Sequence, residues 1–209
     1  MTRRWLLYLE IGLLLAGLSL LTAVWLQRQA LQQPLRLETD YLLEVAPGDT
    51  PGGLLNQLES EGVLNGAFWL RQYWRFNLPN SSLHSGEYRL RSGMSALALL
   101  ELWQRGEVVQ YTIAFIEGWS FQQLRAALAR EQKLQQTLPG LSDTQVMKAM
   151  GWPDTHPEGW FFPDTYRYVR GMRDVDLLRQ AAKRQQQVLG EEWQSRAPEL
   201  PYSTPYEAL

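Results

Sequence analysis

The sequence predicts an α+β protein with an N-terminal transmembrane helix. Three observations support this fold class: a long apolar run near the N-terminus, a strand–turn–helix pattern that occurs three times between residues 41 and 128, and helical periodicity after residue 130. A chain of 209 residues has room for a membrane segment and one or two small domains. We expect an α/β subdomain over residues 38–116 and a mostly helical region over residues 117–209.

Residues 5–26 are predicted to form the transmembrane helix. About 22 residues at about 1.5 Å each cover a hydrocarbon core of roughly 30 Å. Glu10 is the one charge in the run and lies near its end, where a charge costs less than at the midplane. Arg3 and Arg4 precede the run, so the positive-inside rule favours a cytoplasmic tail at residues 1–4 and a body outside the cytoplasm.

The apolar run is long for a cleaved signal peptide, so we expect the anchor to be retained. The Gln-rich residues 27–37 are predicted to form a polar tether between the anchor and the first strand.

One pattern of strand, glycine turn, Ser or Thr cap and amphipathic helix occurs three times after the anchor. An aromatic-rich helix over residues 67–76 separates the first two copies. The strands and their capping residues are expected at 41–45 with Thr50, at 88–90 with Ser95, and at 109–115 with Ser120.

The chain is predicted to be helical after residue 130. Ser142 can cap a short helix that ends at Gly151, and Asp174 or Asp176 opens a long helix that reaches Trp193. The Lys and Arg residues of the long helix are most simply a solvated face, although contact with an anionic wall polymer or lipid is a second interpretation.

Composition excludes several classes of function. A net charge of −2, with no basic stretch, gives no electrostatic case for nucleic-acid binding. The absence of cysteine excludes disulfides, thiolate catalysis and Cys-ligated metals. His84 and His156 are too few and too scattered for a metal cluster, so we expect no metal and no cofactor.

Residues 158–168 read E-G-W-F-F-P-D-T-Y-R-Y and place two carboxylates among five aromatic rings. An acid held against aromatic surface loses solvation and can donate a proton near neutral pH, while ring faces stack on sugars. Polysaccharide is therefore the first substrate class to consider. The alternative is an aromatic loop packed on a core, in which Glu158 and Asp164 cap a helix or a turn.

This motif resembles the E-G-x-x-F-P-D-T-Y signature of the MltG-type (YceG-like) endolytic murein transglycosylases. The resemblance extends over most of the chain, through the anchor, the P-G-D-T of residues 47–50 and the I-E-G-W-S of residues 116–120. It implies a LysM-like subdomain over residues 38–116, followed by the start of a catalytic domain at residues 117–209. It also implies a lyase that cuts peptidoglycan glycan strands without hydrolysis.

The resemblance also implies a set of site residues. The family's catalytic glutamate lies in a later E-K-E motif, which does not occur in these 209 residues, so the catalytic residue is expected beyond Leu209 and the catalytic domain to be incomplete. Residues 204–207 carry the signals of a helix start, an N-cap threonine followed by proline and then glutamate, just before the last two residues. The implied substrate groove consists of Glu158, Gly159, Phe162, Pro163, Asp164, Thr165 and Tyr166.

A lytic transglycosylase needs one carboxylic acid, which protonates the glycosidic oxygen and then accepts the proton of the muramic C6 hydroxyl as that oxygen closes on C1. The resemblance therefore implies no cofactor. It implies peptidoglycan glycan strands and the membrane as partners, with peptidoglycan synthases as further candidates. The implied location is the inner membrane, with a periplasmic body that ends the elongation of nascent strands.

Two other classes remain open from the residues. One is a glycoside hydrolase in which Glu158 is the acid and Asp164 the base. The other is a non-enzymatic, membrane-tethered peptidoglycan-binding protein. LysM modules bind the N-acetylglucosamine part of glycans, but units of this size are also generic α+β packing, so glycan binding by the subdomain stays open.

Overall fold

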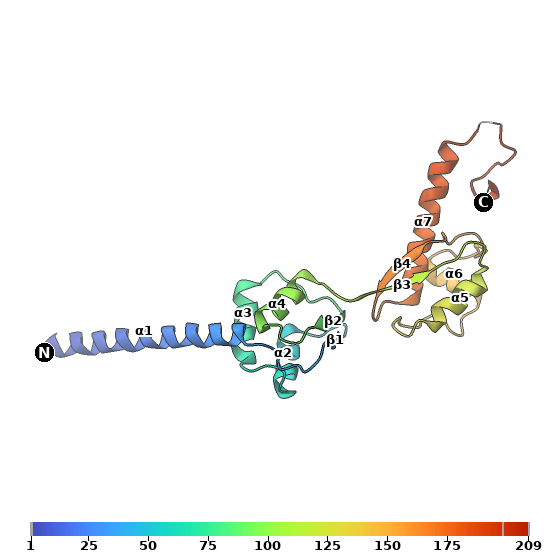
Figure 1. Cartoon of the computed structure of the whole chain (residues 1–209). Helices are drawn as coiled ribbons and strands as arrows, with labels where there is room; N and C mark the ends of the chain where they lie inside the picture. Colours follow the sequence, from blue (N-terminus) through green and yellow to red (C-terminus); the bar gives the residue numbers. More distant parts are fainter. Residues whose placement is uncertain (1, 198, 209) are drawn as a thin grey trace. The chain divides into compact units, whose positions relative to one another are not determined.

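The protein is described by a computed structural model that covers residues 2–197 and 199–208 (Figure 1). In these ranges the chain forms seven α-helices, one short 3-10 helix and two small antiparallel sheets, which confirms the α+β class. Two compact units follow one another, Met1–Val108 and Val109–Leu209. The division therefore precedes the third predicted strand, which belongs to the second unit and not to the subdomain expected over residues 38–116.

The N-terminal helix α1 (Thr2–Gln32) extends beyond the predicted span at both ends. Its part Tyr8–Gln32 is long and apolar enough to cross a membrane. The leucines from Leu9 to Leu26 are exposed, as expected for a helix that can cross a membrane.

The predicted polar tether at residues 27–37 is wrong. The helix continues without a break to Gln32, and Ala30, Leu31 and Leu35 are buried in the core of the first unit. The Gln-rich composition concealed these apolar positions, which are buried while the neighbouring Arg28, Gln29 and Gln32 are exposed. The apolar part of α1 is therefore joined to the first unit by packed helix and not by flexible chain.

The first unit combines a two-stranded sheet with three short helices. β1 (Tyr41–Val45) pairs antiparallel with β2 (Gly86–Leu90), with Leu43 opposite Tyr88. Both of these side chains are buried, together with leucines of the helices and Trp103. The helices are α2 (Pro51–Ser60), α3 (Ala67–Asn77) and α4 (Ala96–Arg105).

The capping residues read from the sequence are confirmed. Thr50, Ser95 and Ser120 each have extended backbone and accept a hydrogen bond from the N–H three residues later, at 3.1, 3.1 and 3.3 Å. These bonds satisfy one of the free N–H groups at the start of α2, α4 and α5 (Phe121–Arg130).

The second unit contains a strand that the sequence interpretation missed. β4 (Thr165–Val169) pairs antiparallel with β3 (Gln110–Ala114), so the chain after residue 130 is not simply helical. Tyr166 and Tyr168 face the core and Thr165 and Arg167 face solvent, which is the alternation of a half-buried strand. The signal was present in T-Y-R-Y-V, but the neighbouring glycine and proline favoured a loop.

The remaining elements of the second unit are α6 (Asp143–Met150), α7 (Asp174–Gln194) and a 3-10 turn at Tyr206–Ala208. The Ser142 cap, the stop at Gly151 and the start of the long helix at Asp174 follow the sequence expectation. The Asp174 side chain is fully buried, and its carboxylate accepts hydrogen bonds from the N–H groups of Thr137, Leu138 and Val175 at 2.8–3.0 Å. It thus fastens the loop before α6 to the start of α7.

Candidate functional site

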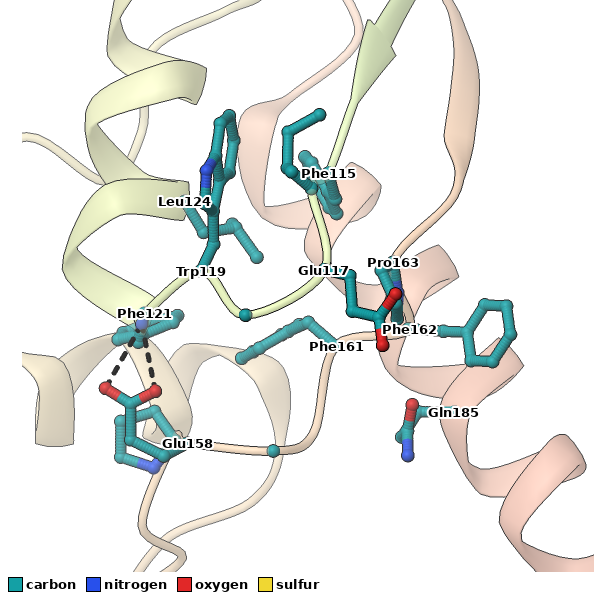
Figure 2. Close-up of a pocket in the computed structure, with 14 residues that line it drawn as sticks. Phe115, Glu117, Trp119, Phe121, Leu124, Glu158, Phe161, Phe162, Pro163 and Gln185 are labelled. Carbon is teal, nitrogen blue, oxygen red and sulfur yellow. Dashed lines mark hydrogen bonds between the residues drawn. The ribbon is translucent and has the colours of Figure 1, made fainter. Parts of the chain in front are cut away.

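A cavity of about 460 Å³ lies in the second unit, where two loops with the sequence E-G-W meet (Figure 2). Ala114 ends β3 opposite Thr165, which begins β4, so the segments that follow β3 and precede β4 leave the sheet at the same edge. The N–H of Phe115 donates to the Asp164 carbonyl at 2.9 Å and holds the two segments together. The lining residues are Phe115 to Trp119, Phe121, Leu124, Pro157 to Gly159, Phe161 to Pro163, and Gln185.

Both loops turn at a glycine. Gly118 has φ +78° and Gly159 has φ +82°, in the left-handed region that side chains with a Cβ rarely adopt. Each glycine follows a glutamate and precedes a tryptophan, so each loop brings a carboxylate and a ring to the same edge of the sheet.

Glu158 is held at the start of helix α5. Its two carboxylate oxygens lie 3.1 and 3.0 Å from the N–H of Phe121, the first residue of the helix (Figure 2). A carboxylate is favoured there because the first N–H groups of a helix lack partners within the helix and carry partial positive charge. This contact agrees with the capping alternative for Glu158, and it ties the second loop to the helix that the first loop leads into.

Glu117 is a second carboxylate of the cavity, and the sequence interpretation did not select it as a site residue. Its side chain is exposed and lies toward Phe162 and Gln185, on the opposite side of the cavity from Glu158 (Figure 2). The available signal was the repeated E-G-W at residues 117–119 and 158–160. That repeat gains meaning only when β3 and β4 are known to pair.

The aromatic residues of the second loop have different neighbours. Phe161 stacks on Phe121, with ring centroids 5.2 Å apart and planes at 14°. The Phe162 ring lies 5.5 Å from the guanidinium of Arg184 on α7. Phe161 therefore braces the base of the cavity against α5, whereas Phe162 packs toward α7.

Trp160 lies outside the cavity lining and belongs to a separate row of rings. It stacks on Tyr206 with centroids 5.1 Å apart and planes at 8°, and its other neighbour is Trp152 at 5.5 Å. The Tyr206 hydroxyl donates to the Glu158 carbonyl at 3.2 Å. Residues near the end of the described chain thus contact the back of the second loop.

The structure brings together four of the seven predicted groove residues. Glu158, Gly159, Phe162 and Pro163 line the cavity. The other three, which are Asp164, Thr165 and Tyr166, lie outside its lining.

Asp164 and Thr165 are exposed, and the Asp164 carboxylate accepts the Thr165 N–H at 2.7 Å. Tyr166 is 8% exposed, and its hydroxyl donates to the Phe162 carbonyl at 2.7 Å, so it supports the loop from the core side. Burial, with the nearby Asp164 charge, raises the pKa of Tyr166 to about 12. These placements follow from the start of β4 at Thr165, which turns Tyr166 inward.

No group of His, Cys, Asp and Glu within residues 2–197 and 199–208 is arranged to hold a metal ion. The cavity instead offers carboxylate and amide groups beside aromatic and proline surface. Such a lining can accept and donate hydrogen bonds to hydroxyl groups while apolar faces pack against C–H surface. Its volume falls within the range of small-ligand sites.

Comparison with known proteins gives one family. The profile of the YceG-like family matches residues 43–209, which include part of the first unit, all of the second and both E-G-W loops. No curated protein matches the chain.

A crystal structure at 2.6 Å resolution, of a protein from Listeria monocytogenes described as YceG-like, is similar over 76% of this chain and 58% of that chain. The sequence identity is 18% and the TM-score is 0.34, so this likeness carries no structural argument. The present chain thus spans little more than half of that chain's length. The family profile covers most of the present chain, and the chain therefore belongs to the YceG-like family.

Proposed function

We propose that this chain is part of a membrane-anchored, endolytic lytic transglycosylase of peptidoglycan, and that the cavity forms part of its glycan groove. One observation carries the proposal. The I-E-G-W-S and E-G-W-F-F-P-D-T-Y segments, which are distant in the sequence and which both resemble the family's motifs, meet at one cavity. The family match over residues 43–209 and the apolar helix α1 support the same proposal.

In the proposed reaction a carboxylic acid donates its proton to the glycosidic oxygen as the bond from that oxygen to C1 of the muramic acid breaks. The muramic C6 oxygen then bonds to C1, and its proton passes to the carboxylate. The products are a 1,6-anhydromuramyl end and a free hydroxyl on the neighbouring sugar, and no water is consumed. The resemblance assigns this acid to an E-K-E motif, which does not occur in these 209 residues.

The residues of this chain would bind and position the strand. Glu117 and Gln185 line the cavity and would hydrogen-bond sugar hydroxyls, and Phe162 and Pro163 would offer apolar surface beside them. Glu158 would act as a positioning residue, because its carboxylate fixes the second loop to α5.

The hydrolase alternative receives less support from the geometry. It requires Glu158 and Asp164 to face one glycosidic bond, with a separation that suits a pair of catalytic carboxylates. Both oxygens of Glu158 accept the Phe121 N–H, and Asp164 lies outside the cavity lining and bonds to its neighbour's backbone. The pair therefore does not form a two-carboxylate site in this conformation.

We further propose that α1 anchors the protein in the inner membrane with both units in the periplasm. Nascent glycan strands are made at that surface, so cleavage there would end their elongation. Peptidoglycan synthases are the proposed protein partners. The apolar length of Tyr8–Gln32 supports the anchor.

The test is to incubate the full-length gene product with uncrosslinked glycan strands and to identify the products by mass spectrometry. We expect 1,6-anhydromuramyl ends. Reducing ends would show a hydrolase, and strand binding without cleavage would show a binding protein. Glu117→Gln should weaken cleavage, whereas the control Glu192→Gln, an exposed position on α7 outside the cavity lining, should not.

A further inference from the structure

Helix α3 exposes large aromatic side chains on its outer face. Phe68 is 51% exposed and Phe76 is 72% exposed. They are separated by two helical turns, with Gln72 between them and Arg75 beside them, and the Arg75 guanidinium lies 5.9 Å from the Phe76 ring. The opposite face of α3 buries Ala67 and Leu70 in the core, and neither Phe68 nor Phe76 belongs to that core.

The start of α3 is fixed to the end of α1. The Gln33 side chain accepts the Asn65 N–H at 3.0 Å and donates to the carbonyls of Asn65 and Ala30. A hollow is shared by Leu26, Gln29 and Ala30 of α1 with Gly66 and Trp69 at the beginning of α3. Figure 1 shows α3 on the side of the first unit at which α1 enters.

The depth of α1 in a bilayer determines how far α3 lies from the membrane surface. Trp5 and Trp25 are about 20 residues apart, which at about 1.5 Å per residue matches a hydrocarbon core of roughly 30 Å. Both are exposed, and tryptophan is enriched at the two membrane–water interfaces. With Trp25 at the outer interface, Leu26 and Gln29, which line the hollow shared with α3, lie within about one turn of the lipid headgroups.

We propose that α3 is a second membrane contact, an interfacial helix whose Phe68 and Phe76 enter the boundary between headgroups and acyl chains. This inference rests on the membrane anchor of the proposed function. Exposed phenylalanine beside arginine is the composition of helices that lie in an interface, where the ring reaches apolar chains and the guanidinium reaches lipid phosphate. Arg75 and Phe76 provide this pair.

The occupant is the bilayer to which α1 belongs, because the packed junction at Ala30, Leu31 and Leu35 leaves no flexible segment that could lift the unit away. The first unit would then have a fixed tilt and height above the membrane. A flexible tether would fix neither the tilt nor the height of the unit.

The absence of cysteine allows the proposal to be tested with single spin labels on the full chain in nanodiscs that hold one copy each. Labels would replace Phe68, Gln72 or Phe76. Leu15 on α1 serves as the deep reference. Exposed Arg89 serves as the aqueous control, because it belongs to β2, a strand that Figure 1 shows across the first unit from α1. Relaxation by oxygen, which concentrates in lipid, is compared with relaxation by a water-soluble nickel chelate.

We expect the ratio of oxygen to nickel accessibility at the three α3 positions to be several-fold higher than at Arg89 and lower than at Leu15. In the Phe68→Ser/Phe76→Ser variant the Gln72 label should lose most of this difference. Three α3 labels as aqueous as Arg89, with Leu15 deep, would overturn the inference and leave the anchor intact. An aqueous Leu15 would overturn the anchor as well, and α3 protection that appears only with two copies per disc would assign the face to a chain–chain contact.

Discussion

Glu117 and Glu158 occupy the same tripeptide, E-G-W, yet their side chains have different surroundings. Glu158 faces the first N–H of α5 and accepts its hydrogen bond with both oxygens, whereas Glu117 is exposed across the cavity near Phe162 and Gln185 (Figure 2). Local sequence thus sets the turn and the placement of the carboxylate. The element opposite the turn determines whether that carboxylate forms a hydrogen bond within the fold or stays exposed and accessible to a ligand.

The contact of Glu158 predicts a change in both stability and activity. Glu158→Ala removes an acceptor at a helix start, so the free energy of unfolding of the second unit should fall by about 1 kcal/mol, and by less for Glu158→Gln, which keeps one acceptor oxygen. Denaturant unfolding of the full protein measures this loss. Cleavage by the full-length product should fall further than the loss of folded protein accounts for, because the second loop moves away from α5. Activity that follows the folded fraction would make Glu158 a structural cap and nothing more.

Tyr166 predicts alkaline sensitivity of the second unit. Its folded pKa, about 12 because of burial and the Asp164 charge, exceeds the unfolded value of about 10. Its contribution to stability is therefore complete below about pH 10 and is lost as the pH rises toward 12. Tyr166→Phe should reduce this loss of stability between pH 8 and pH 11. At pH 8 the variant should cost about 1 kcal/mol, because the Phe162 carbonyl loses its donor.

Denaturant unfolding of both proteins at pH 8 and pH 11 compares their free energies of unfolding. Ultraviolet titration counts the tyrosine hydroxyls whose pKa is raised. Tyr168 remains in the variant as a second such phenol, since burial and its bond to Glu131 also raise its pKa. An equal pH dependence in the two proteins would exclude Tyr166 as a cause.

At the scale of elements, the positions of helix starts were predictable from the sequence, but the second strand of the second sheet was not. Thr50, Ser95, Ser120 and Ser142 cap their helices as the sequence indicated, because a cap depends on residues within one turn. The strand at Thr165 was missed because its identity depends on a partner strand far away in the sequence. Glu117 was missed for the same reason.

The burial at the end of α1 could also not be read from composition. Ala30, Leu31 and Leu35 stand among glutamines, and only the packing of α3 and α4 around them distinguishes a core segment from a tether. Periodicity predicts which face of a helix is apolar, but not which neighbour covers it.

Two glycines should respond in opposite ways to replacement by alanine. Gly118 has φ +78° at the turn into α5, so Gly118→Ala should lower the free energy of unfolding by about 1 kcal/mol through backbone strain alone, since a Cβ there meets no atom within 4 Å. Gly190 lies within α7 with similar open space and ordinary helical backbone, so Gly190→Ala should raise it by about 0.5–1 kcal/mol. Denaturant unfolding measures both, and each variant is the control for the other. A lower free energy of unfolding for Gly190→Ala would contradict this prediction and would show that α7 requires glycine at this position.

At the scale of the whole molecule, the two units have separate cores and separate sheets. Trp103, Tyr88 and the leucines of α2 and α4 form one core, and Phe121, Met147 and the inner face of α7 form the other. Each unit therefore holds its own fold by local burial. The family profile covers residues 43–209, which include part of the first unit and all of the second, so the match to the YceG-like family extends over both cores.

The anchor predicts the side of the membrane on which both units lie. Arg3 and Arg4 precede the apolar run, and with the α-amino group they favour a cytoplasmic N-terminus and an exported body. A reporter enzyme that is active only in the cytoplasm, fused at the C-terminus, should therefore be silent, and a reporter active only in the periplasm should work. Deletion of residues 2–26 should reverse both results, which controls for misfolding of the fusion. If the intact fusion instead gave full cytoplasmic activity, the orientation would be reversed. The cavity would then be separated from glycan strands by the membrane, and the proposed function would fail with it.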